Sequence, residues 1–299
     1  MKNICFFLII LVVLFLFYTY YEKRKEYKLT SSYNLLLKPI VPKQKYIIPK
    51  ICYQTWKTKD LSDDIKMIIK HNKLLNMDIK FKLYDNHDID SYIKKNFNHS
   101  IYSSFKKINP NYGAMKADFF RYCILYREGG IYLDIKSSFK CKLFGNIIKP
   151  NDICILDTKK YICNFIEWRD VLGYRTHEQW LLIFCKGHNY LKSMINIMVE
   201  AIDNYIEPPS FNMSRTFTTE ITEAKEKVLR LTGPDAFTVA IHKSIIFSGI
   251  QHREVNYKLI SKLEHNKTVK NNIYSDIKKT HYSMLNEPLI RDIKEITYF

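Results

Sequence analysis

The stretch that most constrains the fold of this chain is a helical pattern that ends in two glycines and continues directly as a strand. After the turn signal Asn109-Pro110-Asn111, apolar residues recur at three- and four-residue spacing from Ala114 to Tyr126, which predicts an amphipathic helix. Gly129-Gly130 would end this helix, because glycine adopts the positive φ of a C-terminal cap. The run Ile131-Tyr132-Leu133 then predicts a short buried strand, and a helix joined so closely to a strand is typical of an α/β fold.

Three charged residues in this unit form the first candidate site. Asp118 and Arg121 are three residues apart, so they share one face of the helix. Asp134 follows the strand, and ligands of open α/β sheets gather outside the carboxyl ends of strands. A carboxylate there can hold a hard divalent cation, which neutralises a leaving diphosphate. The alternative is an ordinary surface ion pair, worth ~0–1 kcal/mol, beside a strand that ends in aspartate by chance.

The order of these residues resembles the donor-site core of the family 32 glycosyltransferases. This group includes yeast-type mannosyltransferases, mannosyl inositol phosphoceramide synthase-like proteins and relatives of the clostridial glucosylating toxins. The resemblance rests on Ala117-Asp118-x-x-Arg121-Tyr122 followed by Gly129-Gly130-Ile131-Tyr132-x-Asp134. It implies a GT-A-type nucleotide-sugar-binding domain, with a central mixed sheet flanked by helices. It also implies that Asp118 and Arg121 contact the sugar and diphosphate of a UDP- or GDP-sugar, with Asp134 as the first member of an Asp-x-Asp motif for a divalent cation, Mn²⁺.

The chain departs from the family at the second position of that metal motif, where Lys136 replaces aspartate. An ammonium group cannot bind a cation and would repel one nearby. Three explanations remain open: Asp134 holds the metal with a distant ligand, Lys136 balances the diphosphate charge as a point cation, or the site is degenerate. The metal dependence that the resemblance implies is therefore in doubt.

Two segments nearer the N-terminus extend the resemblance. Residues 49–57 predict the first strand of the sheet and its end, and the family pattern implies that Gln54 and Trp56 face the nucleotide base. Trp56 would stack on that base, or it would be an anchor of the core. Residues 80–85 predict a second strand, after which Asp85 reaches the base or ribose, or caps the next helix. We favour the cap.

Two segments nearer the C-terminus complete the set of candidate site residues. Thr232-Gly233-Pro234 resembles a family turn before a helix, which implies backbone N–H groups of Thr232 and Gly233 close to the donor. Pro234 suits the first position of that helix, and Asp235 contacts the donor or stabilises the helix dipole. His281 is predicted as a metal or diphosphate ligand, with a surface histidine as the alternative.

The N-terminal segment predicts a membrane anchor. Residues 4–21 carry no charge, and ~18 helical residues span ~27 Å, enough for a thin bilayer. The segment ends in aromatic residues and lacks the small residues of a cleavage site, so an uncleaved signal-anchor is favoured over a signal peptide. Residues 22–45 predict a stem and 46–299 the catalytic domain, in which residues 206–226 predict a mobile loop over the acceptor site.

The charged residues do not decide which side of the membrane the catalytic domain faces, but they limit the classes of partner that the protein could bind. Basic residues that follow the anchor favour a cytoplasmic catalytic domain by the positive-inside rule; they are Lys23, Arg24, Lys25 and Lys28. The family resemblance implies instead a Golgi or ER lumenal domain. The formal net charge of +17 favours phosphate-bearing donors or anionic lipid. Nucleic acid is excluded as a partner because the lysines are spread along the chain without a known binding motif.

The apolar N-terminal segment and the family resemblance together imply a single-pass membrane glycosyltransferase. It would transfer a hexose, mannose or another sugar, from a nucleotide-sugar donor to a glycan, protein or glycolipid acceptor. The resemblance implies retention of the anomeric configuration. The alternative, favoured by Lys136, is a nucleotide-sugar-binding relative without turnover. None of the seven cysteines lies in a C-x-x-C pair, which argues against a zinc site.

Overall fold

The computed structural model describes residues 48–157, 176–205, 223–263, 285 and 287–291. The predicted anchor, the predicted stem and His281 lie outside these residues. Within them, no helix is both long and apolar enough to cross a membrane.

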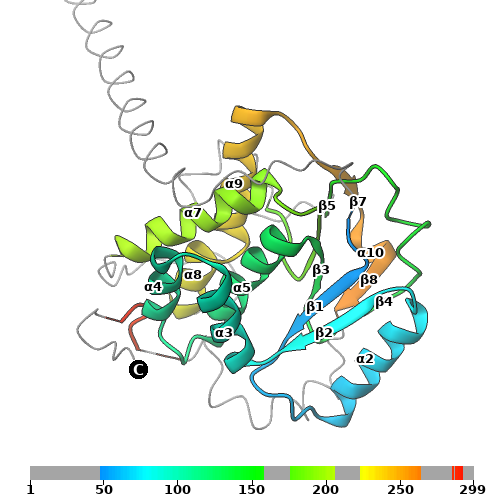
Figure 1. The fold of residues 1–299 in the computed structure, drawn as a ribbon, viewed down its shortest axis with the longest axis horizontal. Helices are drawn as coiled ribbons and strands as arrows, with labels where there is room; N and C mark the ends of the chain where they lie inside the picture. The colour runs from blue at the N-terminus through cyan, green and yellow to red at the C-terminus, as the bar shows by residue number, and fades with distance from the viewer. Residues whose placement is uncertain (1–47, 158–175, 206–222, 264–284, 286, 292–299) are drawn as a thin grey trace, which may run out of the picture. The chain divides into compact units, whose positions relative to one another are not determined.

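The core of the domain is a mixed sheet of six strands in the order β2-β1-β3-β6-β5-β7 (Figure 1). The strands are β1 (Ile51–Thr55), β2 (Lys80–Tyr84), β3 (Gly130–Leu133), β5 (Cys154–Asp157), β6 (Leu181–Phe184) and β7 (Arg253–Val255). β1 pairs in parallel with β2 and β3, whereas β6 runs antiparallel to β3 and β5, and β7 is parallel to β5. All strands except β6 therefore end at the same edge of the sheet. The mixed α/β sheet predicted from the sequence is confirmed.

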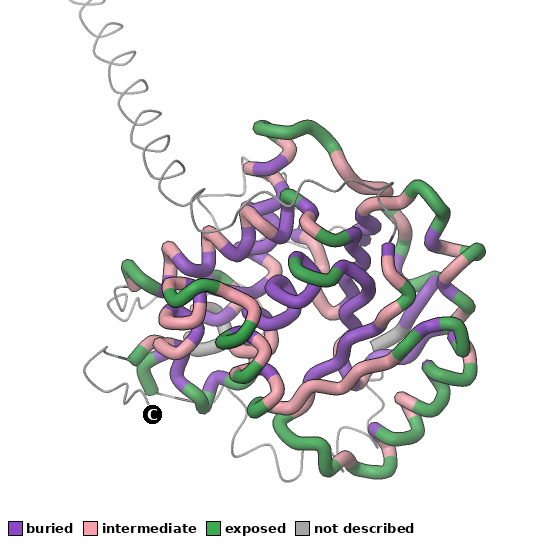
Figure 2. The backbone as a smooth tube through the Cα atoms, viewed as in Figure 1, coloured by how far each residue is buried: buried purple, intermediate pink, exposed green. Residues whose placement is uncertain are grey.

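Helices lie on both sides of this sheet. The elements grouped on one side in Figure 1 are α3 (Asn86–Asn96), α4 (His99–Lys107), α5 (Gly113–Glu128), α7 (Asn189–Asp203), α8 (Glu223–Leu231) and α9 (Pro234–Ser248). On the other side lie α2 (Asp63–Leu75), α10 (Tyr257–Ile260) and a small antiparallel sheet of β4 (Ser137–Phe139) and β8 (Ser261–Leu263). Figure 2 shows that the buried backbone is concentrated in the central strands and in the helices next to them.

The glycine pair after α5 has the role that the sequence predicts. Gly129 caps the helix with a φ of 69°, and Gly130 opens β3 with a φ of 108°. Both conformations favour glycine. A Cβ atom on Gly129 would come within 2.6 Å of the backbone nitrogen of Lys186, and one on Gly130 within 2.7 Å of the carbonyl oxygen of Ile51. The pair thus also lets the end of the helix pack directly against neighbouring backbone.

The surroundings of α5 correct the sequence analysis. An amphipathic helix has one exposed face, but residues 118–126 of α5 are all buried, including the charged Asp118 and Arg121. The helix packs against β3 on one side and against α3 and α7 on others, so none of its central faces reaches solvent. The ion pair predicted on this helix is therefore not a surface pair.

Two other local findings matter below. The predicted loop of residues 206–226 is wrong at its C-terminal end, because α8 begins at Glu223, while residues 206–222 lie outside the described part of the chain. At the start of α7, the buried His188 acts as the N-cap: its Nδ1 accepts the backbone N–H of Tyr190 at 3.2 Å, and its Nε2 lies 3.0 Å from the carbonyl oxygen of Gln251.

Candidate active site

Arg121 is the centre of the site, and its guanidinium group is fixed from four directions. Nη2 lies 3.1 Å from Oδ1 of Asp118 and 3.2 Å from Oδ1 of Asp134. Nη1 donates to the carbonyl oxygen of Gln179 at 2.8 Å, and the guanidinium carbon lies 4.4 Å from the centre of the Tyr132 ring. The structure therefore brings the three predicted catalytic residues together, and it holds the arginine in a single orientation.

Asp118 faces Arg121 from within the core, where only 4% of the residue is exposed. Its other oxygen, Oδ2, accepts the hydroxyl of Thr232 at 2.9 Å. Burial raises the pKa of Asp118 to about 7, although Arg121 and the Thr232 hydroxyl act in the opposite direction. Burial also lowers the pKa of Arg121, but the nearby Tyr132, Asp134 and Asp118 outweigh it and raise that pKa overall. Asp118 is thus a buried counter-charge that positions the arginine.

Asp134 is the member of this trio that reaches solvent, with 37% of its side chain exposed. It follows β3 at the edge where the parallel strands end. Its backbone N–H donates to the carbonyl oxygen of Trp180 at 2.8 Å, and its own carbonyl accepts the N–H of Ser137, which closes a tight turn. The carboxylate is therefore held on a rigid backbone with one side open to a ligand.

Several residues of this site were not identified from the sequence. Tyr132 places its ring under the guanidinium group, and its hydroxyl lies 2.7 Å from the Thr55 hydroxyl. Tyr122 donates to Oε1 of Gln179. A signal for Tyr132 was present, since residues two apart on a strand face the same way, as Tyr132 and Asp134 do. No local signal links Gln179 to Arg121, 58 residues away, and Thr232, 111 residues away, was expected near the donor through its backbone N–H and not through its side chain.

Lys136 and Trp56 meet at the same edge of the sheet. The ammonium group of Lys136 lies 5.2 Å from the centre of the Trp56 ring, within reach of a cation–π interaction. Trp56 is partly buried and packs against the small apolar cluster of Ile65 and Ile135. It is therefore in part a core residue, as one of the two interpretations predicted, while stacking on a nucleotide base stays a prediction.

Gln54 lies on the other face of the sheet. Tyr53 pairs with Tyr132 and lies on the face that carries Arg121, so the alternation of side chains directs Gln54 away from it. The residue is 2% exposed, and its Nε2 has no hydrogen-bond partner within the described part of the chain. Contact between Gln54 and a donor, which stays a prediction, would require this side chain to move.

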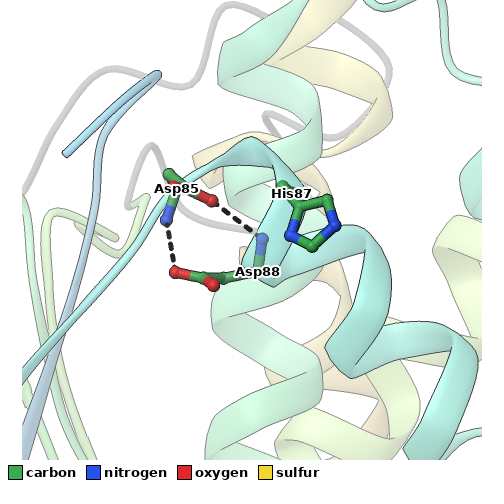
Figure 3. Close-up of side chains that lie close together, drawn as sticks. All are labelled: Asp85, His87 and Asp88. Carbon is green, nitrogen blue, oxygen red and sulfur yellow. Dashed lines mark hydrogen bonds between the residues drawn. The ribbon is translucent and has the colours of Figure 1, made fainter.

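Asp85, His87 and Asp88 form the one group of possible metal ligands found within the described ranges (Figure 3). The side chain of Asp85 accepts the backbone N–H of Asp88 at 2.8 Å, and Asp88 accepts the N–H of Asp85 at 3.2 Å. Lys59 lies 2.8 Å from Asp88, and its hydrogen bond lowers the pKa of that carboxyl group. These contacts form a capping box for α3. The capping role predicted for Asp85 is confirmed, and its contact with a donor stays a prediction.

The turn before α9 has the predicted shape but different hydrogen bonds. Gly233 is the N-cap, Pro234 follows at the start of the helix, and the buried Asp235 lies in its first turn. The backbone N–H groups of Thr232 and Gly233 both lie 3.1 Å from the carbonyl oxygen of Val228, so α8 already uses the amides expected to face the donor. The turn instead supports the site through the Thr232 side chain. Donor binding by Gly233 and Asp235 stays a prediction.

The part of the chain that holds these residues is similar to a known protein family. Residues 48–154 match the family described as "Glycosyltransferase sugar-binding region containing DXD motif". This range holds β1, β2, α5 and β3, and with them Asp118, Arg121 and Asp134. The resemblance to family 32 glycosyltransferases stated from the motifs is confirmed.

Individual relatives agree with this family. The chain is 32% identical over 107 residues to a mannosyl phosphorylinositol ceramide synthase of Saccharomyces cerevisiae, which covers 36% of this chain and 27% of that protein. It is 33% identical over 98 residues to inositol phosphoceramide mannosyltransferase 3 of Schizosaccharomyces pombe, covering 32% and 26%. It is 28% identical over 222 residues to the initiation-specific alpha-1,6-mannosyltransferase of Schizosaccharomyces pombe, covering 68% and 52%. The chain therefore spans about half the length, or less, of these curated relatives.

A solved structure titled "PaToxG Glycosyltransferase" was also found, with a TM-score of 0.48 and 16% sequence identity, covering 75% of this chain and 78% of that one.

Proposed function

We infer that this chain, which carries the glycosyltransferase sugar-binding region in residues 48–154, is a membrane-anchored glycosyltransferase. It transfers a hexose, mannose or another sugar, from a UDP- or GDP-sugar to a glycan, protein or glycolipid acceptor, with retention of configuration. Relatives named as mannosyltransferases favour mannose among the possible sugars.

The observation that carries this proposal is the position of Asp134 and Arg121 at the carboxyl edge of the sheet. Asp134 offers a partly exposed carboxylate, while Arg121 is held 3.2 Å behind it by the buried Asp118. A buried guanidinium group that cannot reorient stabilises negative charge without reorganisation when that charge develops. In a sugar transfer, this charge develops on the leaving diphosphate, so we assign Arg121 and Asp134 to the donor and Asp118 to the positioning of Arg121.

The residues present can hold a divalent cation only with help from the donor. Asp134 is the single partly exposed carboxylate of the trio, and Lys136 occupies the place of the second ligand. One carboxylate together with phosphate oxygens is an ordinary set of ligands for a hard cation such as Mg²⁺. Such a cation, Mn²⁺ in our proposal, would neutralise the leaving diphosphate.

Lys136 supplies a second source of positive charge at this edge. Its ammonium group lies over Trp56, on the end of the strand next to β3. We assign it a share of the charge balance on the diphosphate, which a flexible point cation can provide. Turnover therefore needs the cation less than it would with a complete Asp-x-Asp motif.

The test is release of nucleotide by the full chain in detergent, against a panel of UDP- and GDP-sugars, with Mn²⁺ and with a chelator. Release from one donor is the expected result. Asp134→Asn should lower it by roughly 100-fold or more, as does loss of one group that stabilises charge in the transition state. The matched control is Asp63→Asn, since the side chain of Asp63 is 93% exposed at the start of α2. Wild-type release by the Asp134 variant would refute the site.

The same experiment addresses the second candidate function, a nucleotide-sugar-binding protein without turnover. The observation that favours it is the lysine in the metal motif. A binder would be stabilised by a donor in thermal unfolding but would release no nucleotide in any condition, including mixtures with glycan and glycolipid acceptors. Slow hydrolysis of the donor would exclude this alternative.

A further inference from the structure

The outward face of α2 is unusually apolar for a surface helix. Met67 and Leu74, seven residues apart and so on one face of the helix, are each 62% exposed. Met77, just beyond the end of the helix, is 85% exposed. The opposite face of α2 already supplies its packing, since Ile65 and Asn72 are buried against the domain. We call Met67, Leu74 and Met77 the α2 stripe. Apolar side chains that gather on one exposed face with a polar rim are typical of a membrane or protein interaction site.

Basic residues flank the α2 stripe. From Ile65 to Met77 the chain contains Lys66, Lys70 and Lys73 and no acidic residue. All three lysines are exposed. Three acidic residues border this segment: Asp63, which lies 3.1 Å from Lys66, Asp64, which follows it in the first turn of α2, and Asp78, which lies 2.9 Å from Lys50. Because Lys66 is paired with Asp63, the positive charge beside the apolar side chains comes from Lys70 and Lys73, in the second half of the helix.

The start of the described chain lies at one end of this face. Lys50 bonds to Asp78, the residue after Met77, and the carbonyl oxygen of Lys50 accepts the N–H of Lys80 at 2.9 Å. Lys50, near the start of the described chain, therefore lies beside the C-terminal end of α2. Residues 22–47 separate this point from the apolar residues 4–21 and extend over ~90 Å at most.

We propose that the outward face of α2 docks on the surface of an anionic phospholipid bilayer. Apolar side chains between lysines are the pattern of helices that lie in the membrane interface, where apolar burial and attraction to anionic lipid act together. Residues 22–47 are long enough to let this face reach a bilayer that residues 4–21 would enter. The proposal rests on the proposed anchor and not on the transferase activity.

A second exposed apolar group serves as a control for this proposal. Ile246 and Phe247, in the last turn of α9, and Ile250, just beyond its C-cap, are 73–77% exposed. The end of α9 and α2 lie on opposite sides of the sheet in Figure 1. Lys243 is the one lysine in the segment from Ala240 to Ile250. This group matches the α2 stripe in exposure but lacks its charge and its place beside the start of the described chain.

The experiment measures tryptophan fluorescence of the full chain in vesicles whose lipids carry brominated acyl chains, which quench a tryptophan that enters the bilayer. Leu74→Trp is compared with Phe247→Trp, each relative to the wild type with its native tryptophans. In vesicles with phosphatidylserine, the Leu74 variant should be quenched and the Phe247 variant should not. Lys70→Gln with Lys73→Gln should weaken docking roughly 30-fold, since each lysine near an anionic surface contributes about 1 kcal/mol. The matched control is Lys94→Gln with Lys95→Gln, two exposed lysines at the end of α3.

Each outcome decides the proposal. Quenching at position 74 that needs phosphatidylserine and disappears with the α2 lysines or in high salt supports it. Absence of quenching at position 74, equal quenching at position 247, or no effect of the α2 lysines would overturn it. Nucleotide release is measured on the same samples. If the protein releases nucleotide normally but does not dock on the vesicles, the proposal for the α2 face is wrong and the proposed transferase activity stands. If it docks normally but releases no nucleotide, the proposed transferase activity is wrong and the proposal for the α2 face stands.

Discussion

Replacement of Arg121 by methionine tests whether the arginine and Asp118 act as one buried unit. Methionine keeps much of the volume but removes the positive charge that lies 3.1 Å from Asp118. Asp118 is 4% exposed, so water cannot take the place of the lost partner. Removing one member of a buried ion pair typically costs about 3–5 kcal/mol of stability, because the other charge is left uncompensated. We expect a loss in this range at pH 8.5.

The loss should depend on pH in a defined direction. The pKa of Asp118 is raised to about 7 from an ordinary value of 3.8, so the folded protein holds a proton that the unfolded chain has released between these values. The free energy of unfolding therefore falls as pH rises through this window. Without Arg121 the pKa of Asp118 rises further, and the fall continues above pH 7. At pH 5.5 the carboxyl group is neutral in both proteins, so the loss from Arg121→Met should be clearly smaller there.

The assay is urea unfolding of the full chain in detergent, followed by circular dichroism at pH 5.5 and 8.5. A double-mutant cycle with Asp118→Asn isolates the interaction, and we expect the double variant to recover about 2 kcal/mol relative to the sum of the single losses. Both results follow from a buried, uncompensated carboxylate. Equal losses at the two pH values, or additive losses in the cycle, would refute the reasoning.

Three further changes test other parts of the structure. Lys136→Asp should increase the dependence of nucleotide release on Mn²⁺, and an unchanged response to chelator would mean that this side chain does not act on the donor. Gly233→Ala should lower the melting temperature, since its Cβ would meet the Leu229 Cα at 2.5 Å, whereas Gly113→Ala, with no atom within 4 Å, should be neutral or slightly stabilising. Burial lowers the pKa of His188 from 6.5 to about 4, so between these values only the unfolded chain gains a proton and stability falls as pH drops, by about 3 kcal/mol. His188→Asn keeps a side chain that can accept at the N-cap but does not titrate, so its free energy of unfolding in urea should not show this fall between pH 6.5 and 4. If the wild type and the variant lost the same amount of stability between these pH values, the assignment would be wrong.

The sequence predicted the elements around the site because their signals are local. The glycines at 129 and 130 marked the end of α5 and the start of β3 through the backbone angles that they adopt. Asp85 was predicted as a cap because aspartate before a helix accepts its free N–H groups. Asp118 and Arg121 were predicted to share a face because helical geometry places residues three apart side by side. Each of these inferences needed only a few neighbouring residues.

The burial of α5 was beyond such reasoning. Its apolar spacing predicted one exposed face, yet residues 118–126 are enclosed by β3, α3 and α7. Because Asp118 and Arg121 are buried, they interact strongly within the core, whereas the same pair on the surface would be a weak contact. The partners that complete it, Gln179 and Thr232, come from segments far along the chain.

The sequence by itself therefore determined which side chains could form a donor site, since helix caps, strand ends and residue spacing follow from local backbone geometry. The tertiary structure alone decided which of them meet and with what strength. It placed Arg121 between two carboxylates and Lys136 over Trp56. It also placed the backbone N–H groups that precede α9 in hydrogen bonds to the carbonyl oxygen of Val228. The physical reason is that hydrogen-bond partners and burial depend on how distant segments pack, and burial governs the strength of electrostatic interactions.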